Sequence, residues 1–284
     1  ADGAVVIVPG EERASFGDVG ADWNGLMVAC DDGILCWLSW TTTDGEVAIT
    51  DCNESASGEL VIPETIGGNP VTSIAFAAFL DCINLTSVTI PEGVTSIGEA
   101  AFGDCSSLQS VTIPGGVTSI ERSTFRGCRS LQSVTIPEGV TSIDSDAFRS
   151  CNSLTSITIP GSVTTLGAGV FLNCNSLTGI VIPDSVTETG IYLLGECHDL
   201  TEVTLGSGMT SLGAGIFFGC RSLASVTIPE GVTSIGPNAF RDCSSLTSVI
   251  FPGPAPAEVS ADAFTSVADG AVVIVPGEER ASFG

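Results

Sequence analysis

Residues 85–107 read LTSVTIPEGVTSIGEAAFGDCSS, and this 23-residue pattern recurs, with small changes, along most of the chain. A cysteine column marks the period, with one member in each copy: Cys82, Cys105, Cys128, Cys151, Cys174, Cys197, Cys220 and Cys243. A fixed period of about 20 to 50 residues is the signature of a repeat protein whose copies stack on one another. The sequence therefore predicts a solenoid over residues 60–251.

One copy indicates how each coil folds. Val88 and Ile90 alternate with hydroxyl residues, which is the period-two pattern of a half-buried strand. Pro91 then ends the strand because it has no N–H for the ladder. A single coil has too few apolar residues to form a core alone, so the coils must stack. We predict a β-rich repeat solenoid of 23-residue leucine-rich-type coils.

The flanking segments are predicted to be caps, because open solenoid ends expose unpaired strand edges. Residues 34–59 contain two apolar runs around an Asp44-Gly45 turn, a hairpin signature that predicts an N-terminal capping hairpin. Residues 252–284 form the predicted C-terminal cap. Within that cap, residues 271–276 (AVVIVP) are expected to be a closing strand.

The two ends of the chain carry the same segment. Residues 1–17 and residues 268–284 both read ADGAVVIVPGEERASFG. We interpret residues 1–17 as the cap of a preceding module and residues 18–33 as a linker, so that identical modules follow one another end to end in a tandem array. The alternatives are a subunit whose two like ends serve assembly, and a duplication introduced artificially.

The charge balance excludes two classes of partner. The net charge is −25, from 33 acidic residues against eight basic ones, all of which are arginine. Nucleic acid and anionic lipid are bound by Lys and Arg, so neither is expected as a partner. No run reaches the ~20 apolar residues of a membrane span, so no membrane insertion is expected. Many acids without lysine resemble the surfaces of proteins from salty habitats, with compositional drift as the alternative.

The cysteines are predicted to be structural. The column cysteines fit a small buried hydrophobe, and stacked side chains point in the same direction, so free thiols are expected there. Cys30, Cys36 and Cys52 lie outside the column, and one pair among them would bridge in a secreted protein. The absence of a paired C-x-x-C spacing argues against zinc.

Catalytic and metal-binding candidates are weak, and no catalytic residue or cofactor is predicted. The chain lacks G-x-S-x-G, a phosphate loop and H-E-x-x-H. His198 is expected to be a surface residue at a turn, and Asp144 with Asp146 are expected to be solvated turn acids. Surface calcium is considered only at two loose groups of oxygen ligands, which lack the EF-hand pattern. These groups are Asp18, Asp22 and Asn24, and Asp31 with Asp32.

A hydroxyl face is the most extensive exposed feature that the repeat predicts. One threonine per coil should stack on the outer face of the strands: Thr89, Thr112, Thr135, Thr158, Thr204 and Thr227. This array is our candidate interaction face, for self-association or for a ligand, and ice binding is a further alternative. β-Branched polar residues also simply suit an exposed strand.

The repeat L-x-S-V-x-I-P-x-x-V-T-S-I-x-x-x-A-F-x-x-C-x-S resembles the BspA-type leucine-rich-repeat family. That resemblance implies surface-exposed or secreted proteins of bacteria and some protists, often adhesive, and it brings no catalytic residues. The leading hypothesis is a non-enzymatic structural protein, a tandem module of an extracellular or cell-surface filament or stalk. The alternative is a surface adhesin that binds a protein or glycan through the solenoid face.

Overall fold

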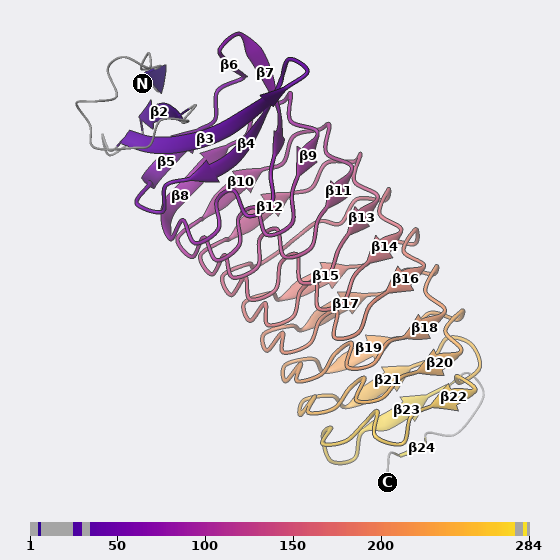
Figure 1. Ribbon diagram of the computed structural model, residues 1–284. Coiled ribbons are helices and arrows are strands. Elements are labelled where there is room, and N and C mark those ends of the chain that lie inside the picture. Colours follow the sequence, from indigo (N-terminus) through magenta and orange to yellow (C-terminus); the bar gives the residue numbers. More distant parts are fainter. Residues whose placement is uncertain (1–4, 7–24, 30–34, 276–280, 283–284) are drawn as a thin grey trace.

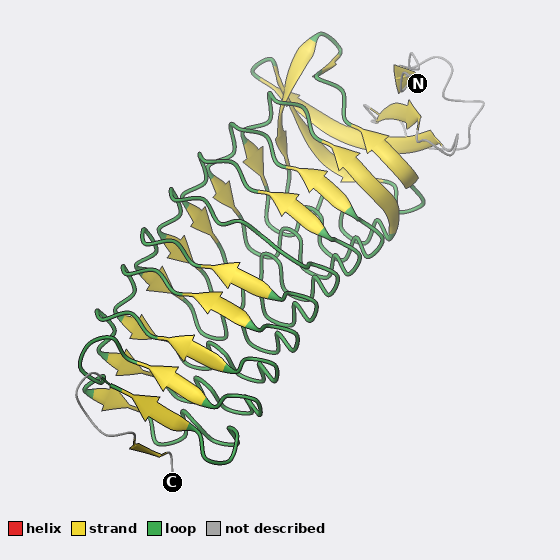
Figure 2. Cartoon of the chain, turned by 180° about the vertical axis from the view of Figure 1, so that it is seen from behind, coloured by secondary structure: helices red, strands yellow, loops and turns green. Residues whose placement is uncertain are grey.

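The computed structural model describes residues 5–6, 25–29, 35–275 and 281–282 of the chain. These residues form an elongated stack of coils that runs from the indigo end to the yellow end in Figure 1, with no helix among them. Two rows of short strands run along the stack, joined by turns (Figure 2). The predicted β-solenoid is confirmed.

The first strand row carries the Ser-Val-Thr triplets. Its strands pair in parallel with a step of one coil, as in Ser87↔Ser110↔Ser133. The central Val88 is buried and Thr89 is exposed, as the alternation predicts. The row comprises β5 (Ser57–Val61), β8 (Asn84–Thr89), β10 (Ser110–Thr112), β12 (Ser133–Thr135), β15 (Gly179–Val181), β17 (Glu202–Thr204), β19 (Ser225–Thr227), β21 (Ser248–Ile250) and β23 (Val272–Ile274), with β24 (Ala281–Ser282) beside β23.

The second strand row comes from the Thr-Ser-Ile part of each repeat, where the isoleucine points inward. Ser119–Ile120 pairs with Ser142–Ile143, which pairs with Thr165–Leu166. The row comprises β7 (Asn69–Ile74), β9 (Ser96–Ile97), β11 (Ser119–Ile120), β13 (Ser142–Ile143), β14 (Thr165–Leu166), β16 (Glu188–Thr189), β18 (Ser211–Leu212), β20 (Ser234–Ile235) and β22 (Glu258–Val259). The short strand β6 (Thr65–Ile66) forms a hairpin with β7.

The third side of each coil consists of turns. Ala100 and Asp104 adopt left-handed φ angles of 55° and 54°, and equivalent residues recur along the stack. The N–H groups of Ala100, Phe102 and Asp104 donate to carbonyls of the next coil, at Arg122, Thr124 and Arg126. This ladder satisfies the backbone polar groups, which would otherwise be costly to bury.

The core is one continuous cluster that includes a column of phenylalanines. Rings of Phe79, Phe102, Phe125, Phe148 and Phe171 stack in sequence, with centroid spacings of 4.9 to 5.9 Å. Leu194 takes the next place in the column, and the stack resumes with Phe217, Phe240 and Phe264. The coils are therefore held together by burial along the whole described stack.

Both predicted caps are present. β3 (Leu35–Thr43) and β4 (Glu46–Cys52) form the hairpin, and β4 pairs in parallel with β7 of the second strand row. Leu38, Val47 and Ile49 of this hairpin are fully buried. Ahead of it, β2 (Gly25–Ala29) pairs with β3, and β1 (Val5–Val6) pairs with β2. At the other end, β23 closes the first row against β21.

Glycine is required where two coils approach most closely. A Cβ at Gly190 would overlap the backbone N and Cα of Ala168 in the preceding coil. We expect Gly190→Ala to lower the free energy of unfolding by about 1 to 3 kcal/mol, because the coil spacing must widen to admit the methyl group. Gly161→Ala is the matched control, since no heavy atom lies within 4 Å of its Cβ position. Chemical denaturation of both variants checks this, and equal effects would contradict it.

Candidate interaction face

The predicted hydroxyl face is exposed, but it is continuous over only part of the rod. All six threonines that define it are exposed. Thr89, Thr112 and Thr135 are paired in register, and Thr158 joins them by a bridge to Thr135. Thr204 and Thr227 lie in the same strand row, but in two other hydrogen-bonded sheets.

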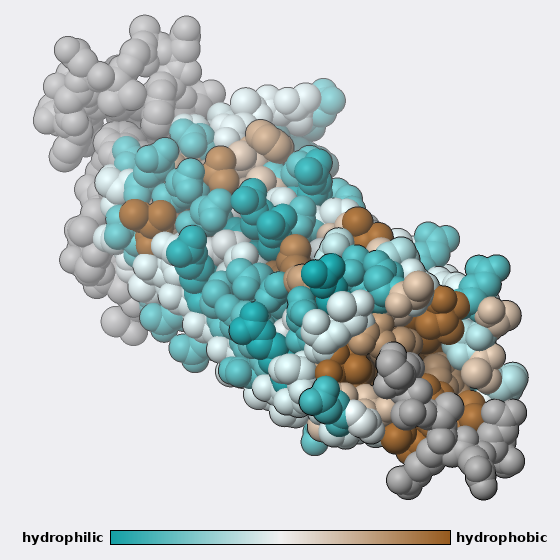
Figure 3. Space-filling model, turned by 90° about the horizontal axis from the view of Figure 1, so that it is seen from below, coloured by the Kyte–Doolittle hydropathy of each residue, from teal (hydrophilic) through white to brown (hydrophobic). Residues whose placement is uncertain are grey.

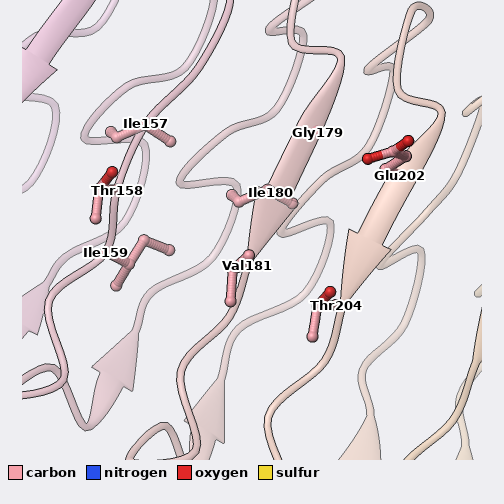
Figure 4. A pocket seen from close by; sticks show the side chains of 8 residues that line it. All are labelled: Ile157, Thr158, Ile159, Gly179, Ile180, Val181, Glu202 and Thr204. Carbon is pink, nitrogen blue, oxygen red and sulfur yellow. The ribbon is translucent and has the colours of Figure 1, made fainter.

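The interruption forms a shallow depression that the consensus did not predict. Gly179 and Val181 occupy the Ser and Thr places of their coil, and Glu202 occupies the Ser place of the next. With Thr158 and Thr204 at its sides, these residues line a hollow of about 460 Å³ (Figure 4). Val181 is 59 % exposed. The hollow offers apolar contact, hydroxyls and one carboxylate. The departures from the consensus at 179 and 181 are the sequence signal that could have indicated it.

The column cysteines are fully buried free thiols. The Sγ–H of Cys128 donates to the carbonyl of Phe102, at 3.1 Å, and Cys151 makes the same contact with Phe125, at 3.2 Å. Burial raises the pKa of Cys197 and of Cys243 to about 12. Because the thiolate is the nucleophile and the metal ligand, these thiols are poor candidates for either role.

The cysteines outside the column are only partly described. Cys52 is a free, buried thiol, and the contact with its neighbour Cys82, together with burial, raises its pKa. Cys30 and the side chain of Cys36 lie outside the described part of the structure. The sequence predicted a bridge for one pair among Cys30, Cys36 and Cys52; the free thiol of Cys52 leaves Cys30 with Cys36, and that pair stays a prediction.

The remaining candidates form small local contacts. The half-buried His198 lies 2.7 Å from a carboxylate oxygen of Glu196, a pairing that the sequence did not predict. Asp146 contacts Arg149 at 3.4 Å, and Asp144 is exposed.

Neither a metal cluster nor a membrane-spanning helix is found within the described ranges. No group of three or more His, Cys, Asp or Glu residues is arranged there to hold a metal ion. The oxygen ligands considered for calcium, Asp18, Asp22 and Asn24 with Asp31 and Asp32, lie outside these ranges. No helix among the described residues is long and apolar enough to cross a membrane.

Comparison with known families settles what kind of repeat this is. The family model described as "BspA type Leucine rich repeat region (6 copies)" matches residues 59–178 and 164–275. The chain belongs to the BspA-type leucine-rich-repeat family. The Phe column, the Cys column and the Ser-Val-Thr strands are thus the core and the outer face of a BspA-type solenoid. A search of curated protein sequences finds no relative of the chain.

Solved structures of bacterial leucine-rich-repeat proteins share the fold. The T. pallidum leucine-rich-repeat protein TpLRR is 31 % identical, with a TM-score of 0.54 over 74 % of this chain and 87 % of that one. A leucine-rich-repeat protein from Bacteroides ovatus is 27 % identical, with a TM-score of 0.54 over 84 % of this chain and 77 % of that one. The chain therefore shares its fold with these bacterial leucine-rich-repeat proteins.

Proposed function

We propose that the chain is a non-enzymatic structural module of a surface filament or stalk, a rod that joins end to end with identical modules. The observation that carries the proposal is the segment shared by residues 1–17 and 268–284. In both places it contributes a paired strand, β1 against β2 and β23 against β21. The extracellular or cell-surface location is part of the proposal and rests on the resemblance to surface-exposed BspA-type proteins.

The described ends of the rod carry apolar surface that supports such joining. Val259 in the last strand of the second row is 46 % exposed, and Phe264 and Val273 are only partly buried against the core. Figure 3 shows apolar atoms gathered at the C-terminal end of the stack. At the other end, the first coil exposes 68 % of Phe76, with Ile83 also exposed. Clustered exposed apolar groups mark association sites.

End-to-end assembly is tested by following particle mass and shape against protein concentration. Light scattering and electron microscopy of the full chain are expected to show linear particles that lengthen as the concentration rises. Val259→Asp places a charge at the rod end and should shorten them, whereas Val181→Asp, on the flank, should not. A single species at every concentration, or equal effects of the two variants, would count against the proposal.

A second candidate function is adhesion through the first strand row. The depression around Gly179 and Val181 favours it, because this is where the hydroxyl face gives way to an apolar contact beside a carboxylate. A protein or glycan ligand bound there should be lost in Val181→Asp and kept in Val259→Asp. The same two variants therefore separate the two functions.

A further inference from the structure

Among the described residues, the closing strand β23 pairs over three residues on one edge and over two on the other. On one edge it pairs in parallel with β21 over Val272, Val273 and Ile274. On the other edge it meets the two-residue strand β24, with Val272↔Ser282 and Val273↔Ala281 in antiparallel register. This outer edge therefore accepts an antiparallel partner, and the described part of that partner is two residues long. An edge of this kind is a template for strand addition.

The first copy of the same segment is paired with a different strand. Val5 and Val6 correspond in sequence to Val272 and Val273. They pair in antiparallel register with β2, as Val5↔Val28 and Val6↔Met27. Because the two copies are identical over 17 residues, a strand that fits one copy also fits the other. The two ends of the chain therefore display two pairings of one strand.

We propose that these two pairings coexist at the junction between modules. β23 of one module keeps β21 on its inner edge, and β2 of the next module takes its outer edge in place of β24. The register is Val272 opposite Val28 and Val273 opposite Met27 of the following module. In a covalent array the strand is shared along the chain. Between separate chains, β23 of one copy replaces β1 of another, which is a strand exchange between identical segments.

The junction has a structural consequence for the filament. β2 pairs with β3, β3 with β4, and β4 with β7 of the second strand row. The first row of one module would then run, through the cap sheet, into the second row of the next. One hydrogen-bonded sheet thus crosses every junction, and successive modules are rotated relative to one another. This inference rests on the proposed end-to-end assembly.

Register-specific cross-linking of two full-length variants tests the junction. Both carry Cys30→Ser and Cys36→Ser. One adds Val28→Cys and Val6→Pro, whose proline removes a β1 donor and opens the edge of β2. The other adds Val272→Cys. After mixing and oxidation we expect a disulfide-linked pair of chains, with a several-fold lower yield when Val6 is retained.

The matched control replaces Val28→Cys by Met27→Cys, because neighbouring residues of a strand point to opposite faces and Met27 is out of register with Val272. Equal linking of the two, or none, overturns the proposed junction. Light scattering of the same mixtures separates the two proposals. Linear assembly without register-specific linking leaves the filament role standing and removes this junction, whereas no assembly and no linking removes both. Circular dichroism of each variant verifies that the solenoid is intact.

Discussion

Raising the pH from 9 towards 12 is expected to unfold the solenoid. The folded state keeps its buried thiols neutral in this range, whereas the unfolded chain releases their protons and is stabilised by doing so. Eight cysteines have a pKa raised above the ordinary value of 9.0, and burial is the first cause for all but Cys52, where the contact with Cys82 ranks ahead of it. They are Cys52, Cys105, Cys128, Cys151, Cys174, Cys197, Cys220 and Cys243. In the unfolded chain the same thiols lose their protons near pH 9.

The sign of the effect follows from proton binding. Above pH 9 the unfolded chain holds fewer protons than the folded one, so the free energy of unfolding falls as the pH rises. Between its unfolded and folded pKa, each thiol lowers the free energy of unfolding by about 1.4 kcal/mol per pH unit. Eight such thiols together lower it by on the order of 11 kcal/mol per unit. The stabilisation is fully present below pH 9. Few other groups titrate in this range, because the chain has no lysine and one tyrosine.

Guanidinium denaturation followed by circular dichroism between pH 8 and pH 11, in the presence of reductant, measures this slope. Cys151→Ala with Cys174→Ala should make it shallower by about 3 kcal/mol per pH unit, since two of the eight thiols are gone. Cys30→Ser with Cys36→Ser is the comparison pair. An unfolding free energy that stays level from pH 9 to pH 11 would mean that the column is open to solvent.

Much of the fold could be read from the period, because each coil repeats its inward positions. Val88, Phe102 and Cys105 are buried as the pattern predicts, and the hairpin around Asp44 forms the predicted cap. The ladder on the turn side could not be read in the same way. Its left-handed positions hold Ala100, Ser123, Asp146 and Tyr192 among others, so they have no common residue type.

The candidate face was predicted by residue type but not in extent. The alternation predicts an outward threonine in the Ser-Val-Thr strands, and all six named threonines are exposed, whereas Val181 and Ile250 hold this place in two other coils. Continuity depends on strand pairing between neighbouring coils, and the sheets break on either side of the pair β15 and β17, before Gly179–Val181 and after Glu202–Thr204. The consensus also gave no sign that threonines next to the second strand row would form hydrogen bonds between coils. The hydroxyl of Thr141 donates to the carbonyl of Thr118, at 3.3 Å, and so ties one coil to the previous one.

Replacing Phe148 by alanine is expected to cost about 3 to 5 kcal/mol of unfolding free energy, the cost of a fully buried aromatic side chain and the cavity that it leaves. The Phe148 ring is fully buried between Phe125, at 5.4 Å, and Phe171, at 5.9 Å, and is nearly parallel to both. Collapse of the site is limited because the Phe148 N–H is held by the carbonyl of Val170 and its own carbonyl accepts from Cys174.

Chemical denaturation of two further variants tests whether the loss of stability comes from the cavity rather than from substitution as such. Phe148→Leu should cost less than about 1.5 kcal/mol, because the chain itself places Leu194 in this column without a break in the coil. Thr135→Ala, on the exposed face, should stay within about 0.5 kcal/mol of the parent. A loss below about 1 kcal/mol in Phe148→Ala would show that the column is not the core, since truncating a well-packed buried phenylalanine to alanine costs more than this. The loss of unfolding free energy should therefore decrease from Phe148→Ala through Phe148→Leu to Thr135→Ala, because each removes less buried side chain than the one before.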